Sequence, residues 1–185
     1  MHRLASVLIV CALSVPVVSG GELAGVTMVD QVTVGDTTLE LNGMGLRKKL
    51  WVEVYVAGLY LESPTSNAAE IVSSTGPKRV VMHFLTNRAT KKKMDAAWFE
   101  GFEGNSPDAY GKLEERVKKF AGFFGDMKDG DVVEIDLTPE VGTSVSVNGK
   151  SVGIIEGDDF ATALLKVWLG DHPPTQDLKA GLLGS

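Results

Sequence analysis

The hydrophobic pattern of this chain changes its period along the sequence. Apolar residues alternate with polar ones from Val26 to Leu41, and an apolar run from Leu50 to Leu61 is rich in β-branched and aromatic residues. Both patterns are typical of strands. The period becomes helical between residues 91 and 124, and strand-like segments return after residue 130. Strands and helices in this order, without regular βαβ alternation, predict an α+β fold with a mostly antiparallel sheet.

Turn residues delimit the predicted strands. Gly35-Asp36 separates the two arms of a predicted hairpin, and a slip in parity before this turn is interpreted as a β-bulge. Asn42–Gly45 is predicted to be a turn, and Asn148-Gly149 is the strongest short signal for a second hairpin. The expected strands cover residues 26–34, 37–41, 50–61, 79–85, 132–137, 144–147 and 150–155.

The predicted helices follow from apolar spacing and end signals. Met94, Ala97, Trp98, Gly101 and Phe102 recur at helical spacing and form one apolar stripe. A second helix is expected to begin at Ser106-Pro107, an N-cap followed by proline, and a later one is expected to be capped by Asp158 and Asp159. The helix after Asp158 and Asp159 is expected over Phe160–Leu169, and shorter helices are expected over Ala68–Ser73 and Gln176–Leu183.

The first twenty residues form a separate apolar leader. His2 and Arg3 precede an apolar run that ends in the small residues Ser19 and Gly20, a pattern typical of a secretory signal peptide. A membrane span needs about 20 apolar residues, and Pro16 interrupts this shorter run. We therefore expect a signal peptide over residues 1–20, one domain over residues 21–185 with no transmembrane segment, and a periplasmic or secreted protein.

Composition excludes several functions. The chain has 18 Lys+Arg against 24 Asp+Glu, a net charge of -6, which argues against nucleic-acid binding. The single cysteine, Cys11, lies in the leader, and His83 and His172 are far apart in sequence, so neither thiol chemistry nor a metal site is expected. Motifs for acyl transfer and nucleotide binding do not occur, and no cofactor is expected.

The segment Gly43–Glu62 combines an arginine and a tyrosine. Arg47 follows the predicted glycine turn, and Tyr55 would lie on the same face of an unbroken strand eight residues later. A guanidinium and a phenol that converge can hold a carboxylate or a phenolate. In the alternative interpretation Arg47 pairs with Glu53, and Tyr55 is a core residue whose hydroxyl binds a backbone carbonyl. The sequence leaves both interpretations open.

This segment, GMGLRKKLWVEVYVAGLYLE, resembles the signature region of the chalcone isomerase family, and in particular its exported bacterial chalcone-isomerase-like branch. The later segments follow in the order of that family over essentially the whole mature chain, although only Gly43–Glu62 is specific. The resemblance implies an open-faced β-sandwich, in which helices cover one face of a large antiparallel sheet and a ligand cleft lies between the layers.

The resemblance also implies roles for individual residues. Arg47 matches the arginine that holds the phenolate or the developing enolate in true isomerases. Tyr55 replaces a threonine of those enzymes and is similar to the plant fatty-acid-binding relatives, in which arginine and tyrosine bind the lipid carboxylate. Thr90 and Ala97 stand where the isomerases have a tyrosine and an asparagine. Losing a single donor to a developing oxyanion costs about 10²–10³ in rate, so the resemblance favours binding over catalysis.

Three functions are compatible with the sequence. The first is non-catalytic binding of a fatty acid or similar amphipathic acid, with Arg47 and Tyr55 at the acid group and with Thr90, Met94 and Ala97 along the cleft. The second is a chalcone isomerase-type intramolecular lyase that acts on a chalcone-like aromatic enone and uses Arg47, Tyr55 and Thr90. The third is a structural or interaction role at the cell envelope. The expected partner is a small amphipathic or aromatic ligand.

Overall fold

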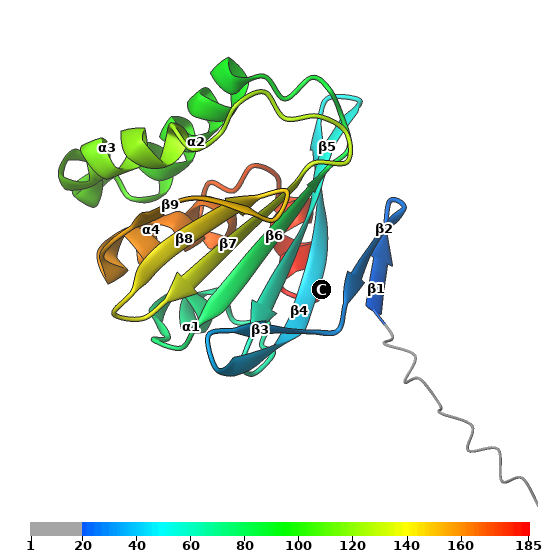
Figure 1. Ribbon diagram of the computed structural model, residues 1–185, viewed down its shortest axis with the longest axis horizontal. Helices are drawn as coiled ribbons and strands as arrows, with labels where there is room; N and C mark the ends of the chain where they lie inside the picture. Colours follow the sequence, from blue (N-terminus) through cyan, green and yellow to red (C-terminus); the bar gives the residue numbers. More distant parts are fainter. Residues whose placement is uncertain (1–19) are drawn as a thin grey trace, which may run out of the picture.

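A computed structural model describes residues 20–185 of the chain, and the predicted signal peptide therefore lies, except for Gly20, outside the described residues. A seven-stranded antiparallel sheet dominates the fold, and its strands are neighbours in the order in which they follow along the chain (Figure 1). The strands are β3 (Gln31–Val34), β4 (Thr37–Lys49), β5 (Val52–Leu61), β6 (Lys78–Phe84), β7 (Val132–Thr138), β8 (Gly142–Val147) and β9 (Lys150–Ile155).

Five helices contribute to one hydrophobic core on a single face of this sheet. They are α1 (Ala68–Ser73), α2 (Lys91–Asn105), α3 (Pro107–Ala121), α4 (Asp158–Leu169) and α5 (Gln176–Leu182). The alternation of side chains in β5 explains the arrangement, because Tyr55, Ala57 and Leu59 point to the helices. The α+β prediction is confirmed, and helices cover one face of a large antiparallel sheet, as the resemblance implied. No helix within residues 20–185 is long and apolar enough to span a membrane.

A small hairpin covers part of the opposite face. Strands β1 (Gly20–Leu23) and β2 (Val26–Val29) pair with each other and pack Met28 against Val56 and Tyr60 of β5. The predicted bulge before Gly35 was wrong, because the slip in parity marks the passage of the chain from β2 to β3, which belong to different sheets.

The predicted turn at Asn42–Gly45 was also wrong, because these residues lie inside β4. Their glycines have a packing role. A Cβ at Gly43 would clash with the carbonyl oxygen of Gly181, and a Cβ at Gly45 would clash with that of Leu178. Helix α5 therefore approaches the strand more closely than any side chain would allow. Gly43 and Gly45, which the sequence pattern places in a turn, instead permit close contact between β4 and α5, more than 130 residues later in the chain.

The actual turn lies between Lys49 and Val52, the last paired residues of β4 and β5. Leu50 and Trp51 form its tip, so the strand predicted over Leu50–Leu61 begins two residues later than predicted, at Val52. The remaining predicted strands correspond to β6, β7, β8 and β9 within a few residues, and Asn148-Gly149 is the turn between β8 and β9, as predicted.

The predicted helices are present, and Ser106 and Pro107 begin α3 as predicted, but the N-cap of α4 differs from the prediction. Ser106 is the N-cap residue of α3, yet its side chain makes no capping hydrogen bond. The N-cap residue of α4 is Gly157, and Asp158 and Asp159 lie in the first turn instead. Carboxylates in a first turn still favour the helix, because they interact with the positive end of its dipole.

Candidate functional site

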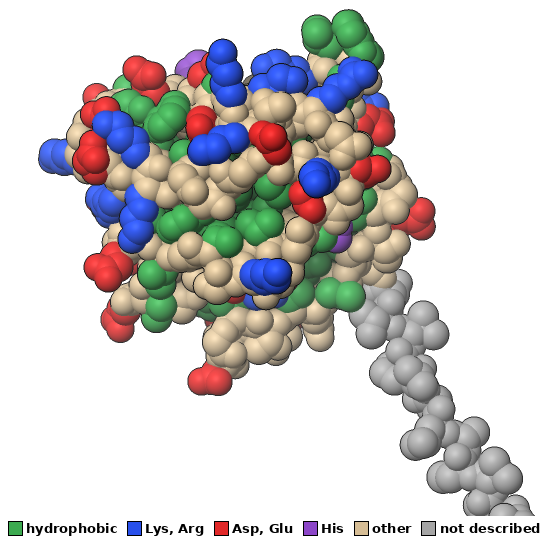
Figure 2. Space-filling view, turned by 45° about the horizontal axis from the view of Figure 1, so that its top comes forward, with side chains coloured by type: hydrophobic (Ala, Val, Ile, Leu, Met, Phe, Trp, Pro, Cys, Tyr) green, Lys and Arg blue, Asp and Glu red, His purple; other side chains and the backbone are tan. Residues whose placement is uncertain are grey.

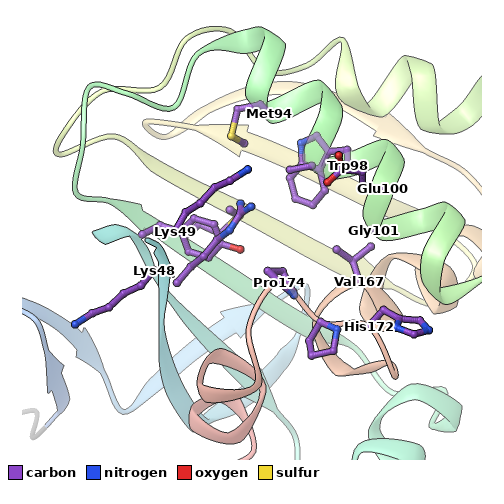
Figure 3. A pocket seen from close by; sticks show the side chains of 14 residues that line it. Lys48, Lys49, Met94, Trp98, Glu100, Gly101, Val167, His172 and Pro174 are labelled. Atoms are coloured by element: carbon purple, nitrogen blue, oxygen red, sulfur yellow. The ribbon is translucent and has the colours of Figure 1, made fainter. Parts of the chain in front are cut away.

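A cavity of about 360 Å³ lies where the ends of β4 and β5 meet α2 and the loop that follows α4. Its walls include Arg47 and Tyr55 from the sheet, Met94, Ala97 and Trp98 from α2, and Pro174 from the loop. Figure 3 shows Met94 and Trp98 on one side of the space and His172 and Pro174 on another, with Lys49 extending toward Met94 and Lys48 directed away. This volume falls in the lower part of the usual range for small-molecule pockets, about 300–1,000 Å³.

Arg47 lies beside Tyr55 because the two residues are directly opposite each other on β4 and β5. The predicted proximity is therefore correct, but the reason given for it was not, because a hairpin turn separates the two residues. The guanidinium carbon lies 5.5 Å from the centre of the Tyr55 ring, within the range of a cation–π contact.

The ion pair between Arg47 and Glu53 does not form. Glu53 pairs with Lys48 over 3.0 Å, and within residues 20–185 Arg47 has no ion-pair partner; its guanidinium lies against the ring and the hydroxyl group of Tyr55. Arg47 is only half-buried and lines the cavity. Its guanidinium donors are consequently available to an anion that enters the cavity.

Tyr55 presents a buried hydroxyl group at the same place. Its side chain is 2% exposed, and its Oη accepts a hydrogen bond of 3.1 Å from Nε1 of Trp168. Burial raises the pKa of Tyr55, although the charge of Arg47 and the hydrogen bond from Trp168 oppose this effect. The phenol is therefore neutral at physiological pH, and its hydrogen has no acceptor among the described residues.

Trp98 is a cavity residue that the sequence analysis did not assign to the site. It lines the cavity from α2, is 3% exposed, and its Nε1 has no hydrogen-bond partner among the described residues. A buried donor without a partner is destabilising; this nitrogen has less than 1 Å² of accessible surface, so the side chain contributes apolar ring surface to the cavity. The indole ring is held by an edge-to-face contact with Trp168, with centroids 5.6 Å apart.

A second cavity of about 260 Å³ adjoins the first one. Arg47, Lys49 and Met94 line both cavities. The second extends from them toward the β4–β5 turn, where its lining is largely apolar and includes Leu50 and Val52. Arg47 therefore lies at the junction of two spaces, each of which could accommodate an apolar group.

The remaining predicted ligand residues lie in different places. Met94 and Ala97 line the first cavity, whereas Thr90, the N-cap residue of α2, is not among the residues that line either cavity. Ala97 offers no polar atom to a ligand. His83 lies in β6 and His172 in the loop after α4. Residues 20–185 contain no group of three or more His, Cys, Asp or Glu side chains that could hold a metal ion.

The chalcone isomerase-like family matches residues 20–184, which is nearly all of the described chain. This chain belongs to the chalcone isomerase-like family. Among solved structures it is similar to the fatty-acid binding protein AtFAP1 of Arabidopsis thaliana, with a TM-score of 0.68 and 14% sequence identity over 86% of this chain and 92% of that chain. At this identity the likeness shows a shared fold. No curated protein sequence matches the chain.

Several residues at the site of this chalcone isomerase-like chain carried no usable local signal. Trp98 belongs to the predicted apolar stripe of the helix, and its spacing from Met94 indicated a core residue. Nothing in that spacing indicated that Trp98 also lines the cavity. Trp168 and Pro174 reach the site from the last quarter of the chain. Only the packing of α4 and its following loop against α2 and β5 brings them together with Arg47.

Proposed function

We propose that this protein binds a fatty acid or a similar amphipathic acid without transforming it, with the acid group at Arg47 and Tyr55. One observation carries the proposal: Arg47 has no acidic partner among the described residues and lies beside the buried, neutral hydroxyl of Tyr55 in a cavity. A buried or half-buried charge normally has a partner in the protein. A ligand carboxylate would supply one.

The donors around the cavity suit a carboxylate group. The guanidinium of Arg47 offers forked N–H donors, and Tyr55 offers one O–H donor whose oxygen is already fixed by Trp168. Hydrogen bonds to a charged group are stronger than those to a neutral one, so these donors would select an acid over an alcohol of the same length.

The apolar walls suit the hydrocarbon part of such a ligand. Met82, Met94, Ala97 and Val167 line the first cavity, and methionine side chains adapt to irregular apolar groups. Each buried CH₂ group contributes about 0.8 kcal/mol to binding. The similarity in fold to a fatty-acid binding protein supports the same class of ligand.

The proposal includes export of the chain. The leader over residues 1–20, with Arg3 before its apolar run and small residues at its end, supports cleavage near Gly20. Determining the N-terminal sequence of the protein recovered from its native host tests this part. An N-terminus at Met1 would contradict it.

The binding proposal is tested by titrating the chain from Gly20 onward with dodecanoate and with dodecanol, which has the same tail but no charge. We expect the wild type to bind the acid more tightly than the alcohol. Arg47→Ala should weaken dodecanoate binding about 10- to 100-fold, because hydrogen bonds to charged groups contribute about 1.5–3 kcal/mol. It should change dodecanol binding little, so that the preference disappears.

The matched control is Lys112→Ala, which removes a positive charge from an exposed position on α3 away from both cavities. Its affinity for both ligands should equal that of the wild type. Failure of the wild type to bind dodecanoate, or an equal loss of dodecanol affinity in Arg47→Ala, would contradict the proposal. Loss of chalcone absorbance above the spontaneous rate would instead favour an isomerase.

A further inference from the structure

The turn between β4 and β5 has an unusual composition. It contains two residues, Leu50 and Trp51, and each is 81% exposed. Leu50 has a positive φ of 57°, a conformation in which glycine, asparagine and aspartate are favoured and large apolar residues are rare. The turn between β8 and β9 of the same sheet has the expected residues, Asn148 and Gly149. Neither turn geometry nor packing within the described chain therefore explains Leu50-Trp51.

Basic side chains surround this tip. Lys49 precedes Leu50 in the chain. Lys49, Arg88 and Lys93 all line the second cavity, which Leu50 also lines. All three are exposed, and none of them forms an ion pair within residues 20–185. Figure 2 shows hydrophobic side chains protruding at the top of the molecule with basic side chains grouped beside them, at the end where Figure 1 places the turn. This basic cluster contrasts with the net charge of -6 of the whole chain.

We infer that the tip formed by Leu50 and Trp51, together with Lys49, Arg88 and Lys93, is a docking surface for an anionic lipid bilayer. Tryptophan is enriched at membrane interfaces, where its ring lies at the level of the headgroups. Lysine and arginine near an anionic membrane surface are attracted to it, each strengthening binding about fivefold. The apolar side chains at the apex of the tip would enter the bilayer at the level of the headgroups. The basic side chains around the apex would face the anionic lipid headgroups.

If the protein binds an amphipathic acid as proposed above, the docking surface would let this acid pass between the bilayer and the cavities. The second cavity begins at Leu50 and Val52 and shares Arg47 and Met94 with the first. A tip that enters the headgroup region would therefore place the opening of this cavity against the bilayer. An amphipathic acid could pass between the bilayer and Arg47 without its tail crossing water.

Vesicle binding tests the inference without any free fatty acid. The chain from Gly20 onward is mixed with vesicles of phosphatidylglycerol and phosphatidylcholine, and in parallel with vesicles of phosphatidylcholine alone. We expect sedimentation with the anionic vesicles, weakening as salt is added. Trp51 is exposed, whereas Trp98 and Trp168 are buried, so brominated lipids should quench the emission of Trp51 selectively.

Two pairs of variants separate the apolar and the electrostatic contributions. Leu50→Ser/Trp51→Ser should weaken binding about tenfold or more, whereas Val152→Ser/Ile154→Ser, at exposed apolar positions on β9, should not. Lys49→Gln/Lys93→Gln should weaken binding roughly 25-fold, from two fivefold contributions. The charge control, Lys112→Gln/Lys150→Gln at exposed positions on α3 and β9, should bind as the wild type does.

The outcomes for docking and for acid binding are distinguishable. Tyr55→Phe should weaken dodecanoate binding and leave vesicle binding unchanged. Trp51 lines neither cavity, so Trp51→Ser should weaken vesicle binding and leave dodecanoate binding unchanged. Absence of wild-type binding to anionic vesicles would overturn the inference. So would a wild type that self-associates through the tip, detected as a concentration-dependent dimer that Trp51→Ser abolishes, with no vesicle binding.

Discussion

Trp168 donates its indole N–H to the hydroxyl oxygen of Tyr55 over 3.1 Å, and the two residues are 113 positions apart in the sequence. This buried hydrogen bond links α4 to the middle of the sheet. It also fixes the rotation of the Tyr55 hydroxyl, because an oxygen that accepts from the indole must direct its own hydrogen elsewhere. The site is therefore ordered by a helix that contributes few atoms to the cavity surface.

Replacing Tyr55 with phenylalanine tests this link. Tyr55→Phe leaves Nε1 of Trp168 buried without a partner, which should lower the free energy of unfolding by about 1–3 kcal/mol. Urea unfolding measures this change. Tyr110→Phe, at a more exposed tyrosine on α3, is the control and should be nearly neutral. Equal stability of the two variants would show that the hydrogen bond contributes little.

The close approach of α5 to β4 predicts an unusual sensitivity to alanine. Gly45→Ala places a Cβ against the carbonyl oxygen of Leu178, and relief of this clash requires α5 to move. We expect a loss of at least about 1–3 kcal/mol in the free energy of unfolding. Gly111→Ala on α3 has open space around the new methyl group and should stabilise the protein by about 0.5–1 kcal/mol. A neutral Gly45→Ala would contradict the packing role of this glycine.

The sheet face opposite the helices contains a paired charge. Nη2 of Arg79 donates to Oδ2 of Asp136 over 2.7 Å, and the two side chains are 17% and 21% exposed. Asp136→Asn keeps the shape but removes the charge, and should cost about 1–3 kcal/mol of stability. Glu53→Gln breaks the more exposed pair with Lys48 and should cost less than about 1 kcal/mol. Thermal unfolding of both variants under the same conditions gives the comparison.

Tyr60 predicts a loss of stability in alkaline solution. Its hydroxyl donates to the carbonyl oxygen of Val29 in β2 over 3.0 Å, and burial, partly opposed by the charge of Arg79, raises the pKa of Tyr60 to about 12. An unfolded tyrosine has a pKa of about 10. Because the folded pKa is the higher one, this contribution to stability is complete below pH 10 and is lost as the pH rises through about 12.

Unfolding measured at a series of pH values checks this prediction. Tyr60→Phe should show a shallower decline above pH 10 than the wild type, because the substituted side chain cannot ionise. Some decline should remain, since burial also raises the pKa of Tyr55. Identical pH profiles for the two proteins would show that the phenol of Tyr60 ionises without opening the contact between the β1–β2 hairpin and the sheet.

The hairpin formed by β4 and β5 at the site shows the limits of sequence reasoning. Val52–Leu61 was recognisable as a strand from its β-branched and aromatic residues, which depend only on local composition. The partner strand β4 was not recognised past residue 41, because its glycines have the local character of a turn. Their actual role depends on α5, and no pattern within the strand refers to that helix.

The candidate site was predictable to the extent that its residues are neighbours in one hairpin or one helix. Arg47 and Tyr55 were selected for their chemistry, and Met94 and Ala97 for their place on the helix that faces the sheet. Thr90 was selected by alignment with the family, but the chain places it at the N-cap of α2, outside both cavities. Its distance from the cavities depends on how α2 lies over the sheet, which spacing along the helix does not specify.

The sequence by itself determined the alternation of periods, and hence the strands, the helices and their order, because these features depend on residues a few positions apart. It also determined that an arginine and a tyrosine follow a glycine-rich segment. The tertiary structure alone decided that those glycines accommodate α5, that Glu53 pairs with Lys48, that Trp98 lines the cavity beside Arg47, and that Trp168 binds the hydroxyl of Tyr55. These contacts join segments that are distant in the chain, and the energy that selects them comes from close packing of the whole core.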